Sequence, residues 1–191
     1  IVDAALVPVP RQRNTRDENA RIKRGEEPED WSENKRRQKD VQARWTKKHG
    51  KSHYGYKNHI SVDRQHKVIR KYAVSSAEVH DSQVFEALLD EHNSSADVWA
   101  DSAYRSTDLE ADLRQAGYRS HVHRKCARGR QLDARAQEAN RKRSTVRARV
   151  EHVFAQQVNR LVRTIGLERA AVKIGMMNLV YNMRRLAWYT G

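Results

Sequence analysis

Residues 54–74 carry the clearest structural pattern in the chain, reading YGYKNHISV (54–62), DRQH (63–66) and KVIRKYAV (67–74). The first and last of these segments are rich in aromatic and β-branched residues, and the four residues between them are polar. Such a pattern is typical of two antiparallel strands joined by a short turn. We therefore predict a β-hairpin, around which the rest of a sheet would be built.

Patterns on both sides of this hairpin extend the sheet and cover it with helices. Apolar runs predict strands over residues 1–7, 97–100 and 118–124. Helical spacing of apolar side chains predicts helices over residues 82–89, 107–116, 146–163 and 165–189, with Asp81 as the N-cap of the first. Strands that alternate with helices favour an α/β fold, whose mixed sheet combines the antiparallel hairpin with parallel strands and is flanked by helices.

The domain boundaries follow from length and polarity. The 191 residues suit one domain spanning residues 1–191. Residues 11–40 are overwhelmingly polar, so we expect a surface excursion over about residues 11–45 that is mobile unless DNA or a partner subunit orders it; a simple solvated loop is the alternative. The chain begins at Ile1 without an initiator methionine, and we expect the N-terminal part of the protein to be missing. In the last helix, we expect Leu179, Met183 and Leu186 to lie in the core rather than in a dimer seam, and Trp188 and Tyr189 to pack.

The charge balance indicates which partners the protein has. Lysine and arginine number 38 against 24 acidic residues, a formal net charge of +14, and the basic residues recur along the whole chain. Nucleic acid is favoured over membrane surfaces or acidic proteins. No apolar run approaches the roughly 18–20 residues of a membrane span. Cys126 is the single cysteine, which excludes an internal disulfide and fits a reducing cytosol. A zinc site at His121, His123 and Cys126 lacks an evident fourth ligand, and we interpret the two histidines as strand residues.

Two acidic residues stand in unusual apolar settings. Asp3 lies inside the first strand, and Asp101 ends the run 97–100. A carboxylate on a buried strand is costly unless it is paired, hydrogen-bonded or bound to a cation. Glu151 lies at the margin of the apolar stripe of its helix, one turn after Arg147. The alternatives are a strand-end cap for Asp101 and a surface ion pair for Glu151 with Arg147.

Three converging carboxylates suit phosphodiester chemistry. Two divalent ions roughly 3.5–4 Å apart activate the attacking oxygen and stabilise the leaving one. Mg²⁺ prefers oxygen ligands and retains waters, so two or three carboxylates suffice to hold it. A basic run opens the helix that carries Glu151, where phosphate contacts would place DNA near the metals; a solvated helix face is the alternative. This run consists of Arg141, Lys142, Arg143, Arg147 and Arg149.

Several separate blocks give the chain a family resemblance. They are VDA (2–4), ARWTKK (43–48), YGYKNH (54–59), VHDS (79–82), ADSAY (100–104), residues 147–154, IGL (165–167) and NLVYNMRR (178–185). In this order the chain resembles the DDE-type transposases of bacterial insertion sequences, which have a ribonuclease H-like catalytic core. The resemblance covers the chain from Ile1 to its end. It implies a ribonuclease H-like mixed sheet, and a cytoplasmic location in a bacterium with association to the nucleoid.

The resemblance assigns the catalytic and metal-binding residues. Asp3, Asp101 and Glu151 match the three acids of the family, with Arg147 at its signature arginine. Ser144 and Val158 stand where the signature usually has a tyrosine and a basic residue; Arg160 or Arg163 is a substitute for the latter. The short interval between Asp101 and Glu151 argues against a large β-domain insertion there.

The implied reaction cuts DNA at the terminal inverted repeats of an insertion sequence and transfers the resulting 3′-hydroxyl ends to target DNA. The cofactor would be Mg²⁺, two ions, with Mn²⁺ as a substitute, and a homodimer would form the synaptic complex. Lys57 and His59 are expected either to contact the scissile phosphate or to form an exposed strand face, and Tyr104 to pack or to position a phosphate. Two other functions remain open: another ribonuclease H-like nuclease, and a catalytically inactive DNA-binding remnant.

Overall fold

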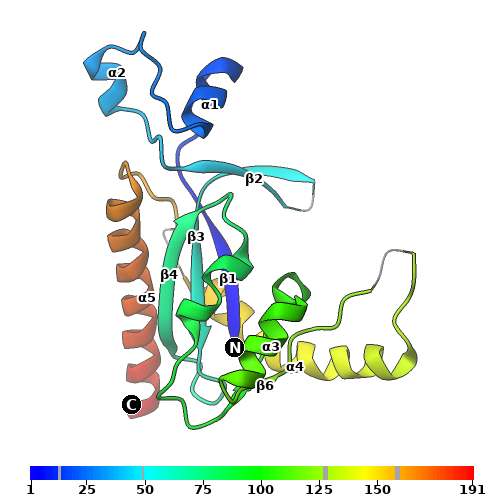
Figure 1. Ribbon diagram of the computed structural model, residues 1–191. Helices are drawn as coiled ribbons and strands as arrows, with labels where there is room; N and C mark the ends of the chain where they lie inside the picture. The colour runs from blue at the N-terminus through cyan, green and yellow to red at the C-terminus, as the bar shows by residue number, and fades with distance from the viewer. Residues whose placement is uncertain (13, 49, 127–128, 158–159) are drawn as a thin grey trace.

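The computed structural model describes residues 1–12, 14–48, 50–126, 129–157 and 160–191. Within these residues the chain forms a mixed α/β structure with antiparallel and parallel strand pairs and flanking helices, as the sequence predicted. Figure 1 shows β3 and β4 beside β1, and α5 running along the β4 side. None of the helices in the described part of the chain is both long enough and apolar enough to cross a membrane.

The main sheet is antiparallel and is organised around one long strand. β3 (Lys51–Val62) pairs with β1 (Val2–Pro8), β2 (Arg44–Lys48) and β4 (Ile69–Ser76). β3 and β4 confirm the predicted hairpin, whereas β2 is an additional strand. Gly55 lies where β3 faces the ends of both β1 and β2, and a Cβ there would lie 2.3 Å from the carbonyl oxygen of Val7. The close approach of the two backbones therefore requires glycine.

A parallel strand pair continues the free edge of β1. β5 (Asp97–Val98) and β6 (Arg119–Ser120) pair in parallel and are connected through α3 (Thr107–Gln115). The Val2 amide donates to the Trp99 carbonyl at 2.8 Å, which joins the region after β5 to β1. The strand predicted over 118–124 is shorter than expected, although the amides of His121 and His123 continue the parallel hydrogen bonding, donating to the carbonyls of Val98 and Ala100.

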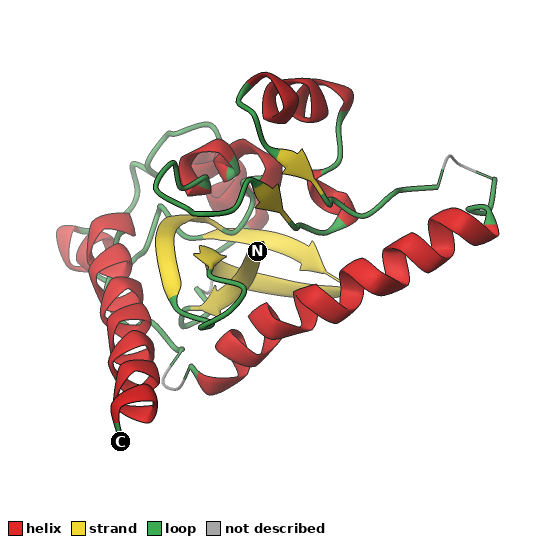
Figure 2. Ribbon diagram, turned by 90° about the horizontal axis from the view of Figure 1, so that it is seen from below, coloured by secondary structure: helices red, strands yellow, loops and turns green. Residues whose placement is uncertain are grey.

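Two long helices pack against this framework. α4 (Ala134–Gln156) buries Val150, Val153 and Phe154 in a cluster with Ile60 of β3, and Tyr181 of α5 (Leu167–Thr190) joins the same cluster. Figure 2 shows the two helices at the two flanks of the sheet. The helix predicted over 146–163 starts twelve residues earlier, after the N-cap Asp133, and ends at Gln156. Val162, which helical spacing predicts to lie on the apolar stripe of this helix, lies beyond its end and donates its amide to the Pro8 carbonyl. Val158, predicted on the same stripe, lies outside the described residues.

The single helix predicted over 82–89 is wrong. The structure has two 3₁₀-helices there, η1 (Asp81–Val84) and η2 (Glu86–Leu88), and His80 rather than Asp81 is the N-cap of the first. Phe85 and Leu88 are both completely buried against the sheet. Residues three apart lie above one another in a 3₁₀-helix, so this tighter geometry brings both side chains into the core.

The polar segment predicted to be irregular contains two helices, α1 (Arg16–Lys23) and α2 (Glu33–Arg37), which lie together beyond β2 in Figure 1. Thr15 and Glu18 form a capping box at the start of α1. The Glu18 carboxylate also accepts from the Trp31 indole at 2.6 Å and from the Lys35 ammonium at 2.9 Å. Local capping and one buried carboxylate therefore organise a segment that lacks a large apolar core.

The C-terminal helix α5 buries a different side from the one that the sequence predicted. Leu179, Met183 and Leu186 are 53%, 60% and 62% exposed, so the prediction that they form core is wrong. Trp188 and Tyr189 are also exposed, and they contact each other edge to face. The side of α5 that packs on the sheet is formed instead by Ala170, Ile174, Met177, Asn178 and Tyr181.

Candidate catalytic site

The sheet brings Asp3 and Asp101 to the same region. Asp3 follows Val2, whose amide bonds to the Trp99 carbonyl, and Asp101 lies two residues beyond Trp99. Side chains alternate along strands. Ile1 and Trp99 pack in one core cluster while Val2 and Ala100 pack in the other, so Asp3 and Asp101 occupy equivalent alternating positions. The charge of Asp101 is felt at Asp3, where it helps to raise the pKa.

The Asp3 carboxylate is confined and has few partners. One oxygen accepts from the Ala4 amide at 2.8 Å, and the other accepts from the Arg147 guanidinium at 2.9 Å. Burial raises the pKa of Asp3 above its ordinary value, and the positive charge of Arg147 opposes that rise. A buried carboxylate near a second carboxylate favours a cation, which Arg147 supplies in this structure.

Asp101 is more accessible. It is partly exposed and is the N-cap of the 3₁₀-helix η3 (Ser102–Tyr104), with one carboxylate oxygen accepting from the Ala103 amide at 2.6 Å. The strand-end cap considered from the sequence is therefore real. This capping role leaves the second oxygen of the carboxylate available to another ligand.

Glu151 is not gathered with the two aspartates. It is exposed on α4, one helical turn after Arg147, and Arg147 rather than Glu151 contacts Asp3. In the described residues, no three Asp, Glu, His or Cys side chains lie close enough to hold a metal ion together, and this holds equally for the histidine–cysteine cluster considered above. Burial of Val150, Val153 and Phe154 fixes the side of α4 that faces the sheet and leaves Glu151 at its margin.

Three polar residues lie near the acid pair, and the sequence suggested a role there for only one of them, Tyr104, as a packing or phosphate-positioning residue. The Tyr104 hydroxyl is buried and has no hydrogen-bond partner within the described structure. Burial raises the pKa of Tyr104, and the charges of Asp81, Asp3 and Asp101 raise it further. Burial lowers the pKa of His123, and the neighbouring Arg147 lowers it too. The ADSAY block contained the signal for Tyr104, whereas only the fold brings Asp81 and His123 close.

Ile60 of β3 is the register partner of Asp3, so the two side chains lie on the same face of the sheet. Lys57 and His59 lie on the opposite face of β3. The Lys57 ammonium donates to Asp81 at 2.8 Å and to the Val79 carbonyl at 2.7 Å. His59 is fully buried beside Ser75, with a ring nitrogen 2.8 Å from its hydroxyl, and burial lowers its pKa to about 4. The exposed strand face is therefore wrong for His59, which has no access to a phosphate in this structure.

The basic run on α4 provides a cationic surface next to the acids. The prediction that this run opens the helix is wrong, because α4 begins at Ala134 and the run lies within it. Arg141 and Lys142 are exposed, and Arg143 is partly buried. Burial lowers the pKa of Arg143, and the nearby positive charges of Arg124 and Arg105 lower it further. Arg105 and Arg124 were not identified from the sequence, because both lie outside the basic run and only the fold brings them near Arg143. The remaining members of the run point elsewhere: Arg147 contacts Asp3, and Arg149 donates to the Arg64 carbonyl.

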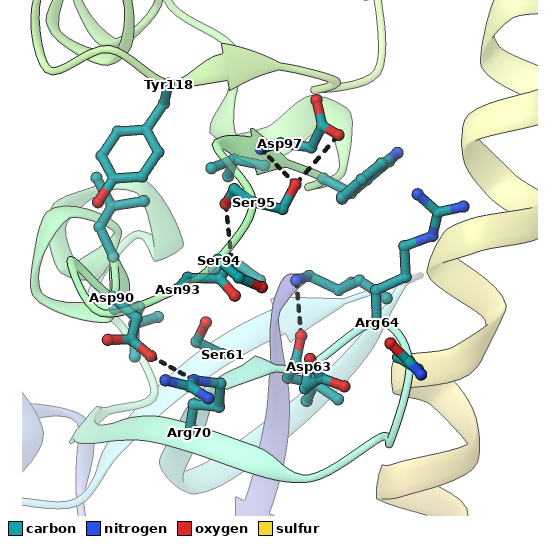
Figure 3. A pocket seen from close by; sticks show the side chains of 18 of the residues that line it. Ser61, Asp63, Arg64, Arg70, Asp90, Asn93, Ser94, Ser95, Asp97 and Tyr118 are labelled. Atoms are coloured by element: carbon teal, nitrogen blue, oxygen red, sulfur yellow. Dashed lines mark hydrogen bonds and ion pairs between the residues drawn. The ribbon is translucent and has the colours of Figure 1, made fainter.

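A cavity of about 510 Å³ lies beside the start of β1, and neither Asp3 nor Asp101 lines it. Figure 3 shows its charged side chains, including the ion pair between Arg70 and Asp90. On its wall the Arg64 guanidinium lies over the Trp99 ring, 5.1 Å from its centre, while His121 stacks on Trp99 with ring centres 4.8 Å apart. Both neighbours cover Trp99, which is 7% exposed.

Carboxylates at a sheet edge beside a cationic helix are typical of domains that act on nucleic-acid phosphates. The chain belongs to the family of transposase DDE domains, whose family model matches residues 1–183. Members of this family generally use divalent metal ions. The family predicted from the sequence is thereby confirmed.

One curated relative is the transposase for insertion sequence element IS1106 of Neisseria meningitidis serogroup B. The two sequences are 29% identical over 133 residues, which cover 70% of this chain and 44% of that protein. The match therefore spans less than half of the length of the relative. No solved structure matches the chain.

Proposed function

We propose that residues 1–191 form the ribonuclease H-like catalytic domain of an insertion-sequence transposase, with residues 11–45 as a surface excursion. The mixed sheet supports this fold, because an antiparallel hairpin and a parallel strand pair meet on either side of β1. The observation that carries the function is the approach of Asp3 to Asp101, made possible by the backbone bond between Val2 and Trp99.

The donor set at this edge fits a hard divalent cation. Asp3 and Asp101 offer carboxylate oxygens, and Asp3 is a buried acid whose charge is costly without a positive partner. We propose that they hold Mg²⁺, two ions in the active complex, with Mn²⁺ as a substitute. Glu151 is the proposed third ligand on the basis of the family resemblance, and its exposed carboxylate is accessible to solvent ions.

The proposed reaction cuts DNA at the terminal inverted repeats of the element and transfers the 3′-hydroxyl ends to target DNA. Bound divalent ions supply activation of the attacking oxygen and neutralisation of the leaving one. The chain itself would bind and orient DNA: Arg141 and Lys142 are exposed within α4, Arg143 beside them is partly buried, and all three would contact phosphates. Arg147 would be available to a phosphate once a cation replaces it at Asp3. We propose a homodimer for the synaptic complex.

Metal binding is the most direct test. We expect Mn²⁺ titrations followed by electron paramagnetic resonance to show saturable binding by the native chain, and Asp3→Asn and Asp101→Asn to abolish it. Asp108→Asn is a matched control, because it removes the same charge from an exposed position on α3. If both Asp3→Asn and Asp101→Asn still bound Mn²⁺ as the native chain does, the proposed ligands would be contradicted.

Cleavage is then measured on duplexes that carry the terminal inverted repeats flanking the gene for this chain. Asp3→Asn, Asp101→Asn and Glu151→Gln should each lower the rate by at least about 100-fold, as is common for loss of one electrostatic group in an active site. Glu138→Gln is the matched control for Glu151, since both are exposed on α4. Full activity of Glu151→Gln would exclude Glu151 as a ligand.

The exposure of Glu151 specifically favours one alternative, an inactive DNA-binding remnant. That function predicts DNA binding that weakens steeply with salt but no metal-dependent cleavage by any variant. A different ribonuclease H-like nuclease would cut RNA–DNA hybrids or four-way junctions without preferring repeat ends. Including these substrates in the cleavage assay distinguishes the three functions.

A further inference from the structure

α5 carries two apolar stripes, on different sides of the helix. One stripe packs on the sheet and contains Ala170, Ile174, Met177 and Tyr181, all buried. The other is open to solvent, and its members are between 53% and 69% exposed. We call it the outer stripe; it consists of Val172, Met176, Leu179, Met183 and Leu186.

The outer stripe has the spacing of a helix–helix seam. Its members are separated alternately by four and three residues from Val172 to Leu186, the heptad pattern of positions that interlock between two helices. The stripe is about 21 Å long at 1.5 Å per residue. Its helix is already held in place by the sheet, so docking a second helix requires no new folding.

The chemistry of the outer stripe selects an apolar, helical partner. Contiguous apolar patches of several hundred Å² are rarely left bare on soluble proteins. DNA is a poor fit, because its phosphates require cations and none of the five side chains carries charge. A heptad stripe is complementary to a copy of itself across a two-fold axis.

The charged residues at the margins of the stripe indicate the direction of pairing. With Met176 and Met183 as the first apolar position of the heptad, Glu168 and Lys173 fall on the two flanks of the seam. They are five residues apart, the separation at which parallel two-stranded helices pair opposite charges between chains. Neither forms an ion pair within the described part of the chain. An antiparallel arrangement would not bring Glu168 to Lys173.

We propose that two copies of this chain associate in parallel through the outer stripe of α5, without DNA. Val172, Leu179 and Leu186 pack in alternation with the two methionines, and Glu168 of each copy pairs with Lys173 of the other. This interface gives the homodimer of the proposed function a defined surface. Its test contains neither DNA nor metal, so failure of the dimer and failure of the catalytic proposal are distinguishable.

The test measures the mass of the purified chain by sedimentation equilibrium at concentrations from 1 to 100 μM, about the range in which modest interfaces associate. We expect twice the 22.3 kDa of one chain at the upper end. Met183→Glu should shift the dimer dissociation constant upward by at least about 10-fold, because it places like charges in the seam. Arg184→Gln is the control: it makes the same change in charge at the adjacent exposed residue outside the stripe. Circular dichroism establishes that both variants remain folded.

Direction is tested by disulfide trapping. In a Cys126→Ser background, Met183→Cys faces its own equivalent across a parallel seam and should form a cross-linked dimer on mild oxidation, whereas Arg184→Cys should not. A native chain that stays monomeric at 100 μM would overturn the proposal, and would assign the stripe to a partner other than this chain. Equal weakening by Met183→Glu and Arg184→Gln, or a dimer without cross-linking at Met183→Cys, would also overturn it.

Discussion

Replacing Arg147 with methionine removes the cation from the buried Asp3 carboxylate while keeping a long apolar side chain. In the native structure the guanidinium lies 2.9 Å from that carboxylate, and the two side chains are 14% and 16% exposed. Breaking a buried ion pair from one side costs about 3–5 kcal/mol, and this partly accessible pair belongs at the lower end. The variant also removes the Arg147 Nε–H, which is buried without a partner, and that relief offsets about 1 kcal/mol. The expected loss is therefore about 2 kcal/mol at pH 7.

The stability lost in Arg147→Met should increase with pH. Burial raises the folded-state pKa of Asp3, so the contribution of this group to stability is fully present below its unfolded pKa and is lost as pH rises through the folded pKa. Arg147 opposes this rise, and its removal raises the pKa of Asp3 further. The difference in stability between the native chain and Arg147→Met should consequently be larger at pH 7 than at pH 4.

Urea unfolding at both pH values measures these differences, and thermal unfolding should show a melting temperature lower by about 4–8 °C at pH 7. Arg141→Met, an exposed change on the same helix, should stay within about 0.5 kcal/mol of the native chain. In an Asp3→Asn background the cost of Arg147→Met should largely disappear. An unchanged cost in that background, or a cost that does not vary with pH, would refute the reasoning.

Three further changes test other parts of the structure. The pKa of His59 is about 4 in the folded state against 6.5 when unfolded, so its contribution to the free energy of unfolding is present above pH 6.5 and is lost as pH falls toward 4. The loss amounts to about 3 kcal/mol. His59→Gln should therefore flatten the stability profile measured by urea unfolding over that range. Tyr104→Phe removes a buried hydroxyl without a partner and should leave the free energy of unfolding unchanged or raise it by up to about 1 kcal/mol; a clear loss in a melting experiment would indicate a hydrogen bond to a neighbouring carboxylate. Thr15→Ala should cost about 1 kcal/mol by deleting the N-cap of α1, measured as faster proteolysis of residues 16–37, with Thr190→Ala at the end of α5 as a control that leaves this segment unaffected.

The sequence predicted the hairpin well because strand patterning and turn polarity are local properties. The helices of residues 16–37 were not predicted, because the segment is low in hydrophobicity; the spacing of Thr15 and Glu18 is nonetheless that of a capping box. The 3₁₀ geometry around Phe85 was not predictable from periodicity, because the apolar spacing there fits either type of helix. Burial against the sheet decides between them.

Burial in the sequence pointed to the two acids, whereas the orientation of the side chains around them was not predictable from the sequence. Asp3 and Asp101 are predicted site residues because an acid in an apolar strand needs a compensating partner. The partner of Asp3 is Arg147, which is 144 residues away, and the rotation of α4 that brings it there depends on how Val150 and Phe154 pack. The same limitation applies to the outer stripe of α5, because both stripes of that helix are apolar and sequence spacing does not show which one the sheet covers.

Arg147 and a divalent cation would compete for one carboxylate in the proposed enzyme. Each oxygen of Asp3 already accepts one hydrogen bond, and the Arg147 charge balances the acid in the absence of metal. A cation that binds Asp3 makes this guanidinium redundant there, while a DNA phosphate offers it a new anionic partner. Metal and DNA would therefore each favour the binding of the other through a side chain on the helix that carries Glu151. Until the metal ion and the DNA are both present, the pairing with Arg147 would balance the charge of the buried Asp3 carboxylate.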